Sequence, residues 1–136
     1  MGRGGFDLSN PQGYDKLPFK ENRMKKKLKI GVIGGGNMGL AIISGIRKTC
    51  AVRVCEQDKG RRGILKKELK LPVGSIVDRP LKPIVSFADI LILAVKPQSF
   101  EEVLLELKEI VTKKHLVISI AAGVTTQYIE KRLQGK

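Results

Sequence analysis

Residues 30–39 read Ile-Gly-Val-Ile-Gly-Gly-Gly-Asn-Met-Gly and place Gly34, Gly36 and Gly39 in a G-x-G-x-x-G arrangement. An apolar run, Leu28–Ile33, precedes this arrangement, and a helical pattern follows it. In a dinucleotide site the first glycine permits the tight turn out of the strand, the second lets the backbone approach a pyrophosphate, and the third lets the helix pack on the strand. The first turn of the helix also offers unpaired N–H groups to phosphates. A flexible glycine turn would explain the spacing alone, but its place between strand and helix predicts nucleotide binding.

The chain has 136 residues, which is enough for one domain with a core of its own. Hydrophobic residues make up 42% of it, and the longest apolar runs have the length of strands, which predicts a soluble globular protein without a membrane span. Two cysteines, Cys50 and Cys55, fit neither a disulfide framework nor a metal site. We therefore expect reduced thiols and a cytoplasmic location.

The net charge of +13 raises the question of nucleic acid. Compact basic runs are few, however: Lys25-Lys26-Lys27, and Arg61-Arg62 followed by Lys66-Lys67. Two tyrosines, four phenylalanines and no tryptophan give no visible platform on which bases could stack. We expect a solvated basic surface that can attract an anionic cofactor, and no nucleic-acid partner.

The chain divides into a tail and a body. Residues 1–27 lack helix or strand periodicity, which predicts a flexible basic extension. Residues 28–136 alternate between strand and helix patterns, which predicts an NAD(P)-binding α/β domain of Rossmann type, a doubly wound and mainly parallel sheet with helices on both faces. We expect strands at 28–33, 52–56, 75–77, 89–95 and 115–121, and helices at 37–48, 58–70, 82–87, 99–111 and 125–133.

Local patterns refine this assignment. Asp58 suits an N-cap, and Ser99 with Glu102 three residues later has the arrangement of a capping box. The apolar runs 90–95 and 116–122 predict two central strands covered on both faces. The first helix is expected to bury a face made of five small or apolar residues, Met38, Ala41, Ile42, Gly45 and Ile46.

Ligands of such sheets bind at the carboxyl ends of the strands, near the point where the strand order reverses. Glu56 ends the second strand, where its carboxylate would accept hydrogen bonds from an adenosine ribose and favour NAD. Arg61 and Arg62 could instead neutralise the 2′-phosphate of NADP. The pattern leaves both cofactors open, and Glu56 could also be a simple solvated strand end.

Two further strand ends belong to the same edge of the sheet. Ala94-Val95-Lys96-Pro97 ends the fourth strand, which Pro97 can stop without needing a backbone donor. Ser119-Ile120-Ala121-Ala122-Gly123 ends the fifth strand, where small residues let a flat ring approach the backbone.

Three segments together resemble the pyrroline-5-carboxylate reductases in sequence, order and spacing: 30–39, Ala-Val-Lys-Pro-Gln at 94–98, and Val-Ile-Ser-Ile-Ala-Ala-Gly-Val-Thr at 117–125. The resemblance covers about residues 28–135. It implies reduction of the cyclic imine 1-pyrroline-5-carboxylate to L-proline, with NADPH as cofactor and NADH as a possible substitute. It also implies that Ile33, Gly34, Gly35, Gly36, Asn37 and Met38 cradle the pyrophosphate, that Glu56 lies by the ribose, that Ala94, Val95, Lys96 and Pro97 line the dinucleotide, and that Ala121, Ala122 and Gly123 approach the nicotinamide. Gly39 and Arg61 complete the predicted cofactor site.

The chain departs from this family in three respects. Leu81 stands where family members often have an asparagine that contacts the cofactor, and the link around residues 48–51 is shorter than usual. Family enzymes also continue with a Met-Pro-Asn-Thr-Pro segment and a helical domain that forms the dimer and holds most of the imine, and this segment is not found before Lys136. Because hydride transfer depends on orientation, we expect dinucleotide binding, with imine bound only beside a complementary domain and little turnover without it.

No catalytic residue is predicted within the chain. His115 is the only histidine and stands far in sequence from any partner, and no paired carboxylates or nucleophile motif are present. Two other functions stay open. One is a related deazaflavin-dependent NADP reductase module, against which the segments at 94–98 and 119–123 argue. The other is a non-enzymatic nucleotide-binding or basic interaction module.

Overall fold

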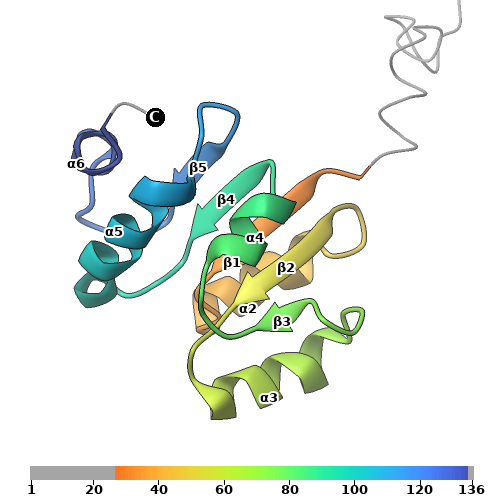
Figure 1. Ribbon diagram of the computed structural model, residues 1–136. Helices are drawn as coiled ribbons and strands as arrows, with labels where there is room; N and C mark the ends of the chain where they lie inside the picture. Colours follow the sequence, from red (N-terminus) through yellow and green to blue (C-terminus); the bar gives the residue numbers. More distant parts are fainter. Residues whose placement is uncertain (1–26, 135–136) are drawn as a thin grey trace, which may run out of the picture.

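The computed structural model describes residues 27–134, which form a five-stranded sheet with all pairs parallel, in the order β3-β2-β1-β4-β5 (Figure 1). The predicted Rossmann-type α/β fold is confirmed, whereas the extension predicted for residues 1–27 falls, apart from Lys27, outside the described residues. The strands are β1 (Lys29–Ile33), β2 (Ala51–Cys55), β3 (Ile76–Val77), β4 (Ile90–Leu93) and β5 (Leu116–Ser119). The helices are α2 (Asn37–Ile46), α3 (Lys59–Leu69), α4 (Lys82–Phe87), the short 3₁₀ helix η2 (Pro97–Ser99), α5 (Phe100–Ile110) and α6 (Thr126–Arg132).

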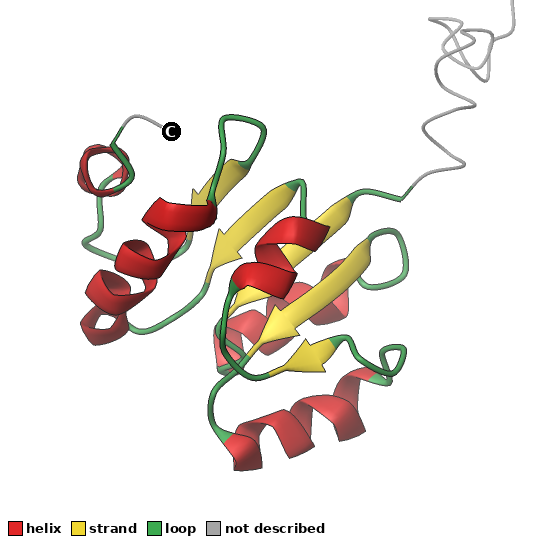
Figure 2. Cartoon of the chain, viewed as in Figure 1, coloured by secondary structure: helices red, strands yellow, loops and turns green. Residues whose placement is uncertain are grey.

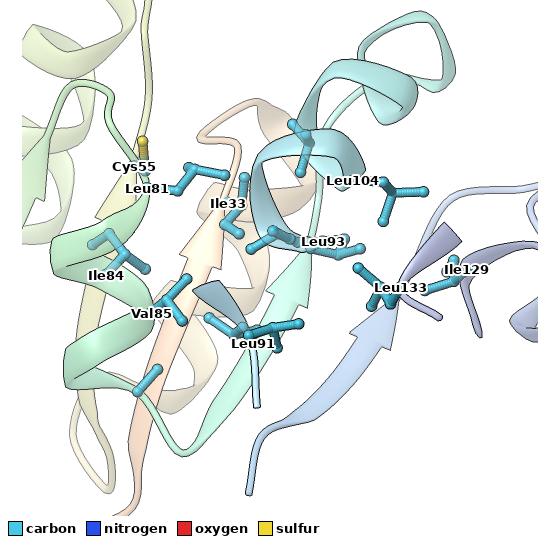
Figure 3. Packing of buried hydrophobic residues seen from close by; sticks show 14 of the residues in the cluster. Ile33, Cys55, Leu81, Ile84, Val85, Leu91, Leu93, Leu104, Ile129 and Leu133 are labelled. Carbon is cyan, nitrogen blue, oxygen red and sulfur yellow. The ribbon is translucent and has the colours of Figure 1, made fainter. Parts of the chain in front are cut away.

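Helices cover both faces of the sheet, as the alternation of strands and helices predicts. Figures 1 and 2 show α4 and α5 in front of the sheet and α2 behind it. Each face has its own apolar cluster. The first contains Leu91 and Leu93 of β4 packed with Ile84 and Leu104 of the front helices (Figure 3), and the second joins β1, β2 and β4 to α2 and α3. Within the described residues, no helix is both long and apolar enough to cross a membrane.

The strand order places the reversal point between β1 and β4. The chain runs from β1 outward to β2 and β3, returns to β4 on the other side of β1, and continues to β5. The loops after β1 and β4 therefore leave the sheet side by side at its carboxyl edge, and the backbone N–H of Ala94 donates to the carbonyl of Ile33 at 2.8 Å. This is the edge at which ligands of such sheets bind.

The prediction of two central strands is right for β4 and wrong for β5. Leu91 and Leu93 of β4 are fully buried. Among the described residues β5 pairs only with β4, and its Leu116 and Ile118 are 57% and 40% exposed. A continuous apolar run indicates a strand, but it does not reveal whether a neighbour exists on each side.

The predicted buried face of the first helix is also wrong in part. Gly39 and Ile43 are the buried residues of α2. Met38 is 60% exposed, and Ala41 and Gly45 are exposed as well. The predicted face lies to one side of the stripe that contacts the sheet, because Gly39 must approach the glycine turn closely.

Two predictions about helix starts have opposite outcomes. Asp58 caps α3, since its Oδ1 accepts a hydrogen bond of 2.7 Å from the backbone N–H of Arg61. The capping box is wrong: the Ser99 side chain makes no cap hydrogen bond, and Glu102 pairs with Arg79 instead. Glu102 pairs with Arg79, which lies 23 residues earlier in the chain, and a local sequence pattern cannot predict a partner at that separation.

His115 has the structural role that its isolation in the sequence suggests. Its Nε2 lies 2.9 Å from the carbonyl oxygen of Val85, and its Nδ1 lies 3.0 Å from the backbone nitrogen of Thr112. The nitrogen of Thr112 can only donate, so Nδ1 accepts and Nε2 carries the proton. The imidazole thus ties the turn before β5 to α4, away from the carboxyl edge.

Candidate functional site

The glycine turn after β1 is held by close packing at its first and third glycines. Gly34 has φ +105°, and a Cβ added to it would lie 2.7 Å from the carbonyl group of Ala94. A Cβ on Gly39 would lie 2.3 Å from the carbonyl oxygen of Gly34. Both positions therefore exclude a side chain for reasons internal to the protein, and they fix the path from β1 into α2.

The second glycine is different, because no contact within residues 27–134 explains it. Gly36 has an ordinary φ of −71°, and a Cβ added there would meet no atom of these residues within 4 Å. It forms the N-cap of α2 without a side-chain cap hydrogen bond, so the N–H groups of the first turn are available to an external acceptor. The open space beside these donors fits a pyrophosphate, which needs close approach to backbone N–H groups.

Glu56 ties the end of β2 to this turn. Its Oε1 accepts a hydrogen bond from the backbone N–H of Gly35 at 2.7 Å, and its Oε2 accepts one from Asp58 at 2.9 Å. The reading of Glu56 as a simple solvated strand end is therefore wrong. Each carboxylate oxygen retains capacity to accept a further hydrogen bond, such as one from a ribose hydroxyl.

Two arginines of α3 flank Glu56. Arg61 Nε donates to the carbonyl of Gly35 at 2.5 Å, and its Nη2 lies 3.3 Å from Oδ1 of Asn37. Arg62 Nη1 donates to the carbonyl of Glu56 at 2.8 Å and forms an ion pair with Asp78 at 3.5 Å. Both guanidinium groups thus lie at the strand end where a ribose and its 2′-substituent would be bound.

A pocket of about 200 Å³ opens at this edge of the sheet. Seven of the predicted residues line it, drawn from the ends of three neighbouring strands: Ile33, Gly34, Gly36, Glu56, Ala94, Val95 and Lys96. Gly35, Asn37, Met38, Gly39 and Arg61 belong to or contact the glycine turn beside it, and Pro97 begins η2 directly after Lys96. Ala121, Ala122 and Gly123 lie in the loop after β5 and are not among the pocket-lining residues.

Sequence reasoning missed most of one wall of the pocket, and of that wall it related only Leu81 to the cofactor, as the position of an asparagine in the family. Seven further lining residues come from the end of β2, the loop before α4 and the start of α5: Cys55, Gln57, Arg79, Leu81, Ser99, Glu102 and Val103. Gln57 could have been found, since it follows Glu56 at a strand end. The loop of Arg79 and Leu81 follows a two-residue strand, whose sequence signal is too short to place it at the edge.

The titratable groups of this wall are not arranged for nucleophilic chemistry. Burial raises the pKa of the Cys55 thiol to about 11, with nearby carboxylates adding to the effect and Arg79 opposing it. A hydrogen bond to Glu106 raises the pKa of Arg79 above its ordinary value, so the guanidinium stays charged. Cys55 is 3% exposed and remains a thiol at neutral pH, which makes it a packing residue. Within residues 27–134, no cluster of His, Cys, Asp and Glu could hold a metal ion.

The residues present fit a nicotinamide dinucleotide. The turn around Gly36 would hold the pyrophosphate, Glu56 would accept from the ribose, and the loop at 94–96 would line the middle of the cofactor. The cofactor supplies the hydride chemistry when it is bound, and the protein supplies position and electrostatics.

Comparisons with known proteins agree with this reading. A model of the family described as "NADP oxidoreductase coenzyme F420-dependent" matches residues 29–123. Pyrroline-5-carboxylate reductase of Methanosarcina acetivorans is 43% identical over 108 residues, which are 77% of this chain and 39% of that protein. Pyrroline-5-carboxylate reductase 1 of Bacillus subtilis is 33% identical over 108 residues, 77% of this chain and 36% of that protein.

A solved structure supports the same relationship. The pyrroline-5-carboxylate reductase of Coxiella burnetii superposes with a TM-score of 0.69 at 33% identity, over 79% of this chain and 40% of that one. The chain thus spans less than half the length of the relatives that it matches. It belongs to the family described as NADP oxidoreductase, coenzyme F420-dependent, and contains a nicotinamide-dinucleotide-binding domain similar to that of the pyrroline-5-carboxylate reductases.

Proposed function

We propose that residues 28–136 are the cofactor-binding domain of an enzyme that reduces 1-pyrroline-5-carboxylate to L-proline. The observation that carries the proposal is Gly36, a glycine with open space around it at the start of α2, between strand ends that carry the reductase-like segments. The relatives that share these segments are named pyrroline-5-carboxylate reductases. The imine would be held mainly by a complementary domain, so we expect little turnover from the chain alone.

We infer that NADPH is the preferred cofactor and that NADH is accepted. The support is the pair of guanidinium groups at the end of β2. Two backbone N–H groups already compensate the Glu56 carboxylate, which reduces its repulsion of a 2′-phosphate, and Arg61 and Arg62 lie beside it. The proposal includes a cytoplasmic location, for which the reduced state of Cys50 and Cys55 is the support.

The chain's own residues have binding and orienting roles in this proposal. The backbone N–H groups of Gly36 and of the first turn of α2 bind the pyrophosphate, since those of Gly34 and Gly35 already donate to Cys55 and Glu56. Glu56 accepts from the N–H of Gly35 and Arg61 donates to the Gly35 carbonyl, which fixes the turn and keeps the donors of α2 in place before the cofactor arrives. Ala94, Val95 and Lys96 line the pocket, and the loop from Ala121 to Gly123 is proposed to approach the nicotinamide.

The deciding experiment is a calorimetric titration of the chain with NADPH and with NADH. Gly36→Asp places a carboxylate in the proposed pyrophosphate space, and Gly45→Asp is the matched control, because Gly45 is also an open position of α2. We expect binding to the wild type and to Gly45→Asp, and none to Gly36→Asp. Equal binding by all three proteins would refute the site.

A second candidate is a deazaflavin-dependent NADP reductase module. The printed description of the matching family, which names coenzyme F420, favours it. An assay of the complete protein with NADPH separates the two. Oxidation of NADPH with 1-pyrroline-5-carboxylate as acceptor supports the imine reductase, and oxidation only with a deazaflavin acceptor supports the alternative.

A further inference from the structure

One wall of the pocket is a cluster of three charged side chains from two separate elements. Arg79 precedes α4, and Glu102 and Glu106 lie one turn apart on α5. Arg79 Nη1 donates to Oε1 of Glu102 at 2.8 Å, and Nη2 donates to Oε1 of Glu106. The other oxygen of Glu106 accepts from the backbone N–H of Leu81 at 2.6 Å. A single carboxylate on α5 therefore fixes both the side chain and the backbone of the loop that forms this wall.

This arrangement constrains what Arg79 can offer a ligand. Both terminal nitrogens of the guanidinium are committed to carboxylates, which fixes its plane. The side chain is nevertheless 25% exposed and lines the pocket. What remains for a ligand is chiefly the flat face of the group, and guanidinium faces stack well on aromatic rings.

The local charge disfavours a phosphate at this wall. Two carboxylates accompany one guanidinium, so the cluster carries a net negative charge, and Glu102 itself lines the pocket. The neighbouring lining residues Cys55, Leu81 and Val103 are apolar. The cations suited to phosphate groups are elsewhere: Arg61 contacts the glycine turn and Arg62 pairs with Asp78, and neither lines the pocket. An uncharged planar ring fits this wall, whereas an anion does not.

We propose that the purine base of the dinucleotide stacks on the guanidinium of Arg79. Glu106 is then a positioning residue that holds Arg79 and Leu81 in place for this stacking. The inference rests on the proposed function, since the base is part of the same cofactor. It assigns a cofactor-binding role to the loop of Arg79, in which Leu81 stands where family members often have an asparagine that contacts the cofactor. The base is recognised by shape and stacking, so the effect of Arg79 is the same for NADH and NADPH.

The test is calorimetry of the 136-residue chain with NADH, NADPH and ADP-ribose. Arg79→Met keeps much of the side-chain length but removes the planar cation, and it should weaken binding of all three ligands by a common factor of about ten. Arg53→Met is the matched control: Arg53 stacks on Phe87 with its guanidinium carbon 4.2 Å from the ring centre, lies outside the pocket, and should leave affinity unchanged.

A double-mutant cycle tests the role of Glu106. Glu106→Gln leaves one oxygen that can still accept from the N–H of Leu81, so its effect passes through Arg79. It should weaken binding about threefold to tenfold in the wild type and have little further effect in the Arg79→Met background. Measuring affinity well below the unfolding midpoint separates this effect from a loss of stability. Additive losses would overturn the positioning role.

Two other outcomes would overturn the stacking role. A loss confined to NADPH would mean that Arg79 contacts a phosphate, and unchanged affinity for ADP-ribose would mean that no base stacks on it. Binding of ADP-ribose by the wild type but not by Gly36→Asp would show that the proposed cofactor site exists. In that case either of these two outcomes refutes the stacking role of Arg79 and leaves the proposed function standing. If the wild type binds none of the three ligands, both fail together.

Discussion

The carboxylate of Glu56 accepts a hydrogen bond of 2.7 Å from the backbone N–H of Gly35, a residue 21 positions earlier in the chain. This contact joins the end of β2 to the turn after β1. It gives the acidic residue a structural task as well as its predicted place beside the ribose. The strand end and the glycine turn therefore form one unit, and changes in either should affect both stability and cofactor affinity.

Removal of the Glu56 side chain should destabilise the chain by about 1 to 3 kcal/mol, because two backbone donors, those of Gly35 and Asp58, lose a charged acceptor. Glu56→Ala is the test, and urea unfolding followed by circular dichroism is the measurement. Glu56→Gln should lose roughly half as much, since its one remaining oxygen can still accept from Gly35. Equal stability of the two variants would contradict this account.

The three glycines of the motif should respond differently to alanine. Gly34→Ala places a Cβ at φ +105° and 2.7 Å from the Ala94 carbonyl, so we expect a loss of about 2 kcal/mol or more. Gly36→Ala should change the free energy of unfolding by less than about 1 kcal/mol, because the backbone of Gly36 is ordinary and its surroundings are open. Its affinity for NADPH should nevertheless fall. Denaturant midpoints and calorimetry measure the two effects, and a Gly36→Ala protein that binds normally would argue against a ligand in that space.

Arg61 should distinguish the two cofactors. Arg61→Met is expected to weaken NADPH binding about tenfold, equivalent to about 1.4 kcal/mol of binding free energy. It should weaken NADH binding by less, because only NADPH carries the 2′-phosphate. Arg47→Met serves as the control, since Arg47 bonds to the carbonyl of Leu69 between α2 and α3. Dissociation constants for both cofactors would be compared at one salt concentration. Equal losses of affinity for the two cofactors would mean that Arg61 only holds the turn at Gly35 and does not contact the 2′-phosphate.

The buried thiol of Cys55 should make the fold sensitive to alkali. Burial raises its pKa from 9.0 to about 11, so the folded state holds the proton more tightly than the unfolded state does. The resulting stabilisation is present below pH 9, falls as the pH rises from 9 to 11, and amounts to about 2 to 3 kcal/mol. Urea midpoints at pH 8 and pH 10.5 would show this slope.

Cys55→Ala supplies the reference for that measurement, because it retains every other alkaline titration of the chain. The wild type should lose more stability than this variant between the two pH values. Parallel losses would contradict the assignment to Cys55. A thiol reagent at pH 8 should modify half-buried Cys50 in the folded chain and reach Cys55 only on unfolding.

The order of strands and helices, the glycine turn and the Asp58 cap are all predictable from the amino-acid sequence. These features depend on periodicity and on neighbours within a few residues, which a single sequence records directly. The same local signals identified the strand-end residues from Ala94 to Lys96 that line the pocket, because strand ends of a parallel sheet share one edge.

Three features depend on the folded chain as a whole: which strand lies at the edge, which face of α2 is buried, and which residues complete the pocket. Leu116 and Ile118 of β5 have the apolar character of a central strand, yet no described strand covers their outer side. Glu102 forms an ion pair with Arg79 in place of the predicted capping box, and Glu56 accepts a hydrogen bond from Gly35. In each case the deciding partner is distant in sequence. A strand's position in the sheet and a side chain's partner depend on contacts between segments that are distant in sequence. A local pattern of residues carries no information about those contacts.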